Sequence, residues 1–162
     1  MFRMNKLSDY GLVLLTHFAR HLDRPQQSAG DLAAETNLPL PTVGKLLKLL
    51  ARGGLLVSHR GAKGGYSLAR PPERISVTEI ICALEGPISI TECTDNSASC
   101  EYEPCCPNRP HFERINQVIL EALDKVSLLE LAYPVGGSVP VVETVFPLPQ
   151  VADPALLEAP AR

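Results

Sequence analysis

The chain has 162 residues, of which 45% are apolar and 20% are charged. This length suits one compact domain, or a small domain with an arm and a tail, and the apolar fraction is large enough to bury a core. No apolar run is long enough to cross a bilayer, and the first residues lack the layout of a secretion signal. We therefore expect a cytoplasmic protein with no membrane partner.

The net charge of −3 conceals an asymmetry between the two parts of the chain. Residues 1–70 contain ten Lys and Arg but four Asp and Glu, whereas the remainder contains five basic and fourteen acidic side chains. A basic first half makes a polyanion a plausible partner for that half alone.

Three helices are predicted in the basic half. Apolar residues recur at three- and four-residue steps over 7–22, with Ser8 as the expected N-cap. A short helix follows over 28–37, and Ser28 is its expected N-cap. The third helix covers 42–52 and is both strongly apolar on one side and basic on the other.

A β-hairpin is predicted next, because two short apolar runs at 55–57 and 66–68 flank the glycine-rich sequence RGAKGG. A capping box at 76–79 then opens a fourth helix. Helix, short helix, basic helix and hairpin is the order of a winged helix-turn-helix. The predicted fold is therefore mainly α with a small β-hairpin wing, and we assign the winged domain to residues 1–85.

The basic helix and the hairpin tip carry the candidate DNA-binding residues. A helix that enters the major groove, about 12 Å wide, needs an apolar face to anchor it and a polar, cationic face to offer. At the hairpin tip, glycines allow the backbone to approach phosphate. The predicted contacts to double-stranded DNA are Thr42, Lys45, Lys48, Arg60 and Lys63. The alternative is a winged domain that binds protein, with ordinary solvated lysines.

Four of the five cysteines lie within fourteen residues, at 93, 100, 105 and 106. Thiolates at such spacing can converge on an iron–sulfur cluster or on zinc. The spacing lacks the paired knuckles of zinc fingers, so an iron–sulfur cluster ranks first, ahead of zinc and a reversible thiol switch, with free or disulfide-paired thiols as the further alternative. Adjacent Cys105 and Cys106 point in different directions, so one of them is expected to ligate. Cys82 has apolar neighbours and is expected to be buried.

A long helix is predicted from about Pro110 to about Leu131. Its apolar residues have heptad spacing, at 112, 115, 119, 122, 126 and 129. Residues 134–162 are rich in proline and have no convincing period, so we expect a flexible tail.

Residues 3–133 resemble the bacterial iron–sulfur-cluster-sensing winged-helix transcriptional regulators of the Isc-regulator and NsrR type. The segments that carry the resemblance are KLSDYG at 6–11, LLVSHRG at 55–61 with GGYSL at 64–68, VTEII at 77–81, ITEC at 90–93 with the cysteine loop, and VSLLE at 126–130. The sequence GPISITECT at 86–94 is most similar to the SUF-system regulators.

The resemblance implies a homodimer that forms through the long helices and a 2Fe–2S cluster as cofactor. It assigns residues 86–111 to an iron–sulfur-binding loop and residues 112–133 to a dimerisation helix. The ligands that carry over by position are Cys93, Cys100 and Cys106. Of the DNA contacts, Thr42, Lys45 and Arg60 carry over. Gly44 stands where the Isc regulator has a glutamate that affects which DNA sites it binds.

The resemblance leaves the fourth cluster ligand open. Arg109 stands where the Isc regulator has a ligand histidine, and a guanidinium stays protonated and does not ligate. Asp9 matches the aspartate of the partner subunit's first helix that completes the site in the nitric-oxide sensor. Cys105 and His111 are the other candidates.

The expected function is that of a DNA-binding repressor that senses iron–sulfur status and controls SUF assembly genes. Nitric oxide or redox stress is the alternative signal, and a metal-binding docking module without DNA is the alternative function. The sequence has no glycine-rich phosphate loop and no Ser/His/Asp arrangement, so neither an enzyme nor a small-molecule substrate is expected.

Overall fold

The computed structural model describes residues 5–61, 64–94, 100 and 106–133. The described part is mostly helical and contains one two-stranded antiparallel sheet, which confirms the predicted fold class. The elements in chain order are α1 (Lys6–Arg20), α2 (Ala29–Thr36), α3 (Leu40–Arg52), β1 (Leu56–His59), β2 (Gly65–Leu68), the 3-10 turn η1 (Pro72–Arg74), α4 (Val77–Glu85), the 3-10 turn η2 (Glu92–Thr94), α5 (Arg109–Asp124) and α6 (Leu128–Ala132).

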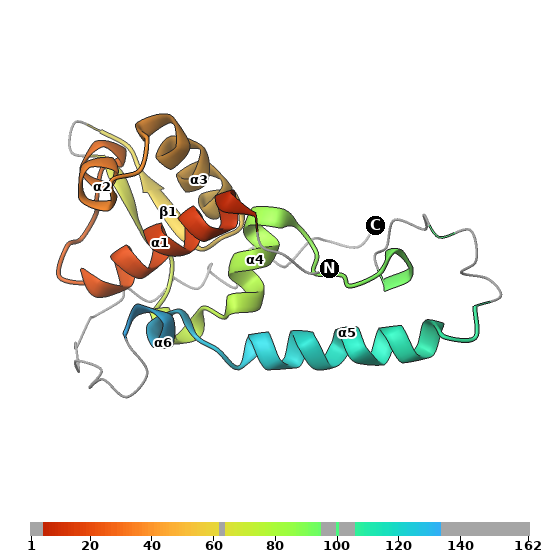
Figure 1. The fold of residues 1–162 in the computed structure, drawn as a ribbon. Coiled ribbons are helices and arrows are strands. Elements are labelled where there is room, and N and C mark those ends of the chain that lie inside the picture. The colour runs from red at the N-terminus through yellow and green to blue at the C-terminus, as the bar shows by residue number, and fades with distance from the viewer. Residues whose placement is uncertain (1–4, 62–63, 95–99, 101–105, 134–162) are drawn as a thin grey trace, which may run out of the picture.

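One hydrophobic core holds α1, α2, α3, α4, the hairpin and α6 together as a winged-helix body (Figure 1). Its centre consists of fully buried leucines such as Leu14 and Leu15 of α1 and Leu46, Leu47 and Leu50 of α3. The helix α5 instead runs along one edge of this body and extends beyond it (Figure 1).

The start of α1 differs from the prediction, because Asn5 and not Ser8 is its N-cap. The side chain of Asn5 accepts hydrogen bonds from the backbone N–H groups of Leu7 and Ser8, at 2.8 and 3.0 Å. Ser8 lies inside the helix, is buried, and donates its hydroxyl proton to Glu85 at the end of α4. A Cβ at Gly11 would lie 2.5 Å from the side chain of Leu84. The motif KLSDYG therefore docks α1 closely on α4.

The hairpin forms with Leu56 paired to Leu68 and His59 paired to Gly65. Its root is joined to the loop before α2, because the backbones of Gln27 and Tyr66 exchange two hydrogen bonds of 2.9 Å each. The wing is thereby held beside the helix-turn-helix at its base.

The expected single helix from Pro110 to Leu131 is wrong, because α5 ends at Asp124 and α6 begins at Leu128. The side chain of Ser127 caps α6 in a capping box with Glu130. The intervening backbone pairs with the segment before α4: the Leu128 N–H donates to the Ile75 oxygen at 2.8 Å, and the Val77 N–H donates to the Val126 oxygen at 2.9 Å. The chain thus returns to the winged-helix body, where Leu128 and Ala132 enter the core.

Several expectations lie outside the described residues, namely the flexible tail over 134–162, the DNA contact of Lys63 and the role of Cys105. Among the described helices, none is long and apolar enough to span a membrane.

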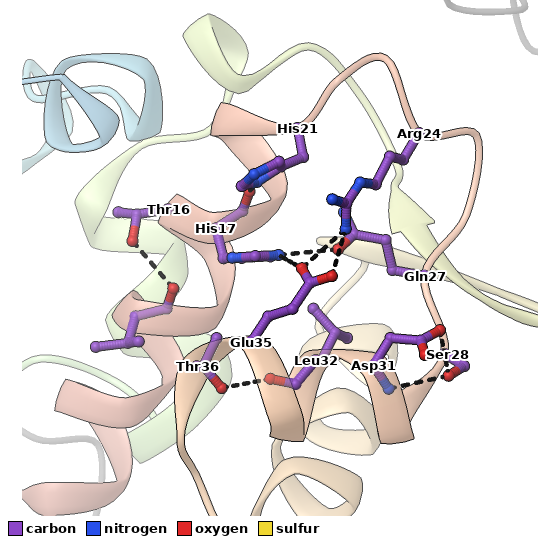
Figure 2. Close-up of polar contacts among 11 residues, drawn as sticks. Thr16, His17, His21, Arg24, Gln27, Ser28, Asp31, Leu32, Glu35 and Thr36 are labelled. Carbon is purple, nitrogen blue, oxygen red and sulfur yellow. Dashed lines mark hydrogen bonds and ion pairs between the residues drawn. The ribbon is translucent and has the colours of Figure 1, made fainter.

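A polar cluster joins α1, α2 and the loop between them (Figure 2). The Nε2 atom of His17 lies 2.9 Å from Glu35 Oε2 and 3.1 Å from Gln27 Oε1, and Arg24 donates to both carboxylate oxygens of Glu35 at 2.8 Å. The ring of His21 stacks on that of His17, with 4.2 Å between centroids. Burial and the neighbouring His21 lower the pKa of His17, and the carboxylate of Glu35 offsets only part of this effect.

This cluster predicts a pH-dependent stability. Because the pKa of His17 lies below its usual 6.5 in the folded protein, the unfolded chain binds this proton more tightly. The stability that neutral His17 contributes to the folded protein is therefore intact above pH 6.5 and is lost as the pH falls below that value. We expect the melting temperature to fall less between about pH 7 and about pH 5.5 in His17→Gln than in the unaltered protein.

The matched control is His59→Gln, which removes an exposed histidine of β1. It should keep the full fall in melting temperature. An identical fall in His17→Gln would show that His17 does not supply this pH dependence.

Candidate nucleic-acid interface and cysteine segment

The helix α3 has one buried face and one exposed, basic face. Its buried side chains are Val43, Leu46, Leu47 and Leu50. Lys45, Lys48 and Arg52 are exposed, and Thr42 is half-buried. Because Thr42, Lys45 and Lys48 are spaced by three residues, they line one side of the helix. The predicted DNA-facing residues of α3 therefore lie together on the side away from the core.

The wing adds a further exposed cation, Arg60, directly after β1. Gly44 on α3 is half-buried, and a Cβ placed there would have no neighbour within 4 Å. The backbone of α3 is thus open to close approach at this point.

This arrangement predicts a salt-dependent interaction with duplex DNA. Each lysine that contacts a phosphate releases counterions on binding, so its removal lowers the slope of log affinity against log salt by about one. We expect Lys48→Gln to weaken binding to a duplex selected by the protein from a random pool and to flatten this slope, as measured by fluorescence anisotropy.

Arg114→Gln is the control, because it removes an exposed cation from α5. It should leave the slope unchanged. Equal slopes for Lys48→Gln and the unaltered protein would show that Lys48 does not contact the DNA backbone.

We call residues 86–108, between α4 and α5, the cysteine segment. The C-cap of α4 is Gly86, whose φ of 93° lies in the left-handed region that favours glycine. Cys93 lies in η2, and its Sγ is 3.2 Å from the hydroxyl of Thr91. Cys93, Cys100 and Cys106 are all half-buried and free. Asp9 is exposed in the first turn of α1, and His111 is exposed in the first turn of α5.

The structure does not bring these donors together within one chain. Among the described residues, no three His, Cys, Asp or Glu side chains are placed to hold a metal ion. Cys82 differs from its prediction: it is exposed on α4, because Ile80, Ile81 and Leu84 occupy the buried side of that helix.

Asn116 holds the start of the cysteine segment against α5. Its side chain is buried, accepts from the Ile90 N–H at 3.2 Å and donates to the Ile88 oxygen at 3.3 Å. Hydroxyl groups of Ser89, Thr91 and Thr94 then hydrogen-bond with one another. Asn116 was not among the residues predicted from the sequence, although a polar residue four positions before Leu120 on an apolar helix face is a recognisable signal.

The two hydrogen bonds of the buried Asn116 side chain are expected to stabilise the fold. Leucine at this position would leave the Ile90 N–H and the Ile88 oxygen without partners, which costs about 1–3 kcal/mol for a buried polar group. We expect Asn116→Leu to lower the free energy of unfolding by that amount in urea denaturation.

Gln117→Leu is the matched control, since Gln117 is exposed and its side chain donates to Glu121 on the same helix, at 3.0 Å. It should change the free energy of unfolding little. A loss in Gln117→Leu as large as that in Asn116→Leu would contradict the assigned role of Asn116.

The helix α5 also keeps an apolar surface open to solvent. Leu120 and Leu123 pack on a small core with Val77, Ile81 and Ile88. On other sides of α5, Ile115 and Val118 are each 48% exposed. A helix with such a surface is suited to packing against another helix.

The winged helix-turn-helix with a basic exposed face on α3 defines the class of the protein as a DNA-binding transcriptional regulator. A family model described as Rrf2, iron-dependent transcriptional regulator, matches residues 4–134. The chain belongs to the Rrf2 family. It is thus a regulator and not an enzyme.

Similar proteins agree with this assignment. The HTH-type transcriptional regulator CymR of Bacillus subtilis is 34% identical over 123 residues, which cover 76% of this chain and 84% of CymR. The solved structure of CymR, described as the global cysteine regulator of B. subtilis, has a TM-score of 0.63 at 31% identity and covers 82% of this chain and 97% of that one. The structure of T. potens IscR has a TM-score of 0.58 at 28% identity, with 78% and 83% covered.

Proposed function

We propose that this regulator senses iron–sulfur status through a 2Fe–2S cluster, and that it represses genes of SUF-type iron–sulfur assembly as a homodimer on a DNA operator. The observation that carries the proposal is the presence of three free, half-buried thiols, Cys93, Cys100 and Cys106, on the segment between α4 and α5. The family description as iron-dependent and the similarity to IscR support it.

The chemistry of the donor set fits such a cluster. Thiolates are the usual protein ligands of iron–sulfur clusters, and half-buried positions limit access of water. When bound, the cluster would supply a centre whose presence depends on iron, oxygen and nitric oxide. Cys93, Cys100 and Cys106 would hold it, and a fourth donor would come from Asp9 of the partner subunit, Cys105 or His111.

The positions of the donors indicate how loading would act on the fold. Among the described residues, the three thiols are not placed to hold one metal ion, so holding a shared centre requires Cys93, Cys100 and Cys106 to close on one another. Asn116 joins the start of the cysteine segment to α5, and Gly86 joins it to α4. Closure would therefore reposition α5, whose exposed apolar surface we assign to the dimer contact, and with it the spacing of the two α3 helices.

A second candidate function is regulation of cysteine metabolism. The similarity to CymR, the global cysteine regulator of B. subtilis, favours it. A regulator of this second kind would bind its operator with equal affinity whether or not the thiols hold iron.

The cluster itself is tested by anaerobic purification. We expect broad visible charge-transfer bands and about two irons and two sulfides per chain. Cys93→Ser, Cys100→Ser and Cys106→Ser should each lose most of the iron, because each removes a thiolate ligand. Cys82→Ser is the matched control, since Cys82 is exposed on α4, and should retain the iron.

A colourless, zinc-containing protein, or equal iron in all four variants, would overturn the assignment. The variants Asp9→Ala, Cys105→Ser and His111→Ala identify the fourth donor by their loss of iron. Titration with nitric oxide, compared with iron starvation, separates the two candidate signals.

A further inference from the structure

A polar pocket of about 360 Å³, open to solvent, lies where the link between α5 and α6 meets the winged-helix body. Residues 70–79, which include η1 and the start of α4, form one wall. The other wall is formed by Asp124 at the end of α5 and by Lys125 and Ser127 of the link. We call this site the hinge pocket. It lies apart from the cysteine segment and from the exposed face of α3, so neither assigned site uses it.

The two walls are fixed relative to each other by main-chain hydrogen bonds. The backbones of residues 75–77 and 126–128 pair across the base of the pocket, at 2.8 and 2.9 Å. Ser76 and Ser127 face each other in this pairing, and each caps the helix that follows it. The pocket is therefore built on rigid helix starts and not on a loose loop.

The charged side chains of the pocket fall into two groups. Arg70 and Glu79 pair with each other at 2.6 Å. Glu73 and Arg74 on the first wall, and Asp124 and Lys125 on the second, are exposed to solvent and make no side-chain hydrogen bond or ion pair to another described side chain. In addition, the Nε atom of Arg70 is buried and has no hydrogen-bond partner within the described part of the chain. A buried N–H without a partner is rare in folded proteins.

This charge pattern selects the ligand class. Each wall presents one free cation and one free anion. A purely anionic ligand would meet the carboxylates of Glu73, Glu79 and Asp124, and a purely cationic one would meet three basic side chains. A ligand with both a carboxylate and an ammonium group can pair with both signs. The volume lies at the small end of the range for ligand sites, about 300–1,000 Å³.

We propose that the hinge pocket binds a small zwitterion of the α-amino-acid class, which bridges the η1 wall and the α5–α6 link. Such a ligand spans the two walls, with its carboxylate facing Arg74 and Lys125 and its ammonium group facing Glu73 and Asp124. The site adjoins the link that returns the chain from α5 to the winged-helix body, and the proposal does not depend on the cluster proposal. Allosteric coupling is reciprocal: a ligand that raises the affinity of the protein for its operator is itself bound more tightly by the operator-bound protein, by the same factor.

The test uses the full-length protein with its cysteines reduced and iron removed, and the twenty free L-α-amino acids as probes. We expect at least one amino acid to raise the melting temperature and to bind in calorimetry. Its N-acetyl derivative and its amide, which each lack one of the two charges, should bind at least about tenfold more weakly.

Arg74→Gln and Lys125→Gln should each lower the affinity for the same amino acid by about tenfold, the order of one lost charged contact. Arg114→Gln, which removes an exposed cation outside the pocket, should leave it unchanged. The proposal is overturned if no amino acid binds, if the derivatives bind as well as the parent, or if Arg114→Gln and the pocket variants behave alike.

Discussion

The pairing of residues 75–77 with residues 126–128 is the constraint on which the arrangement of the whole molecule depends. It ends α5 and places Leu128 and Ala132 in the winged-helix core. Arg20 of α1 also holds the end of α6, because its side chain donates to the Ala132 oxygen at 2.6 Å. Together with the packing of Leu120 and Leu123 on α4, this pairing fixes the direction in which α5 leaves the body.

The helix α5 is consequently held by different contacts at its two ends, and Leu120 and Leu123 between them pack on α4. Its C-terminal end is held by backbone pairing, whereas its N-terminal half is joined to the cysteine segment through the side chain of Asn116. Backbone pairing in a core resists change more than one amide side chain does. A rearrangement of the cysteine segment is therefore expected to pivot α5 about its C-terminal end, close to the hinge pocket.

The wing and the helix-turn-helix were predictable from the sequence, because their signals are local. Ser28 and Ser76 cap the helices that they were expected to cap, and the glycine-rich sequence does lie between two strands, at 60–64. The break between α5 and α6 was missed because the heptad spacing continues across it. The capping sequence from Ser127 to Glu130 was nevertheless present as a local signal.

The errors at Ser8 and Cys82 have a different cause. A polar residue at a helix start suggests a cap, but Ser8 finds its partner in Glu85, far along the chain. Apolar neighbours in sequence suggest burial, but helical phase turns Cys82 outward. The candidate DNA-binding and cysteine residues stay predictions from residue type and spacing, whereas the contacts of Asn116 and the lining of the hinge pocket join distant segments that no periodicity reveals.

The central claim is that loading of the cysteine segment changes how the protein binds DNA. The most direct measurement is the affinity for one selected operator, determined at fixed salt on the iron-loaded protein and on the same preparation after iron removal under reducing conditions. The account predicts at least a fivefold difference, the order of a typical allosteric coupling, and no difference in Cys93→Ser. Equal affinities for the loaded and iron-free protein would contradict it.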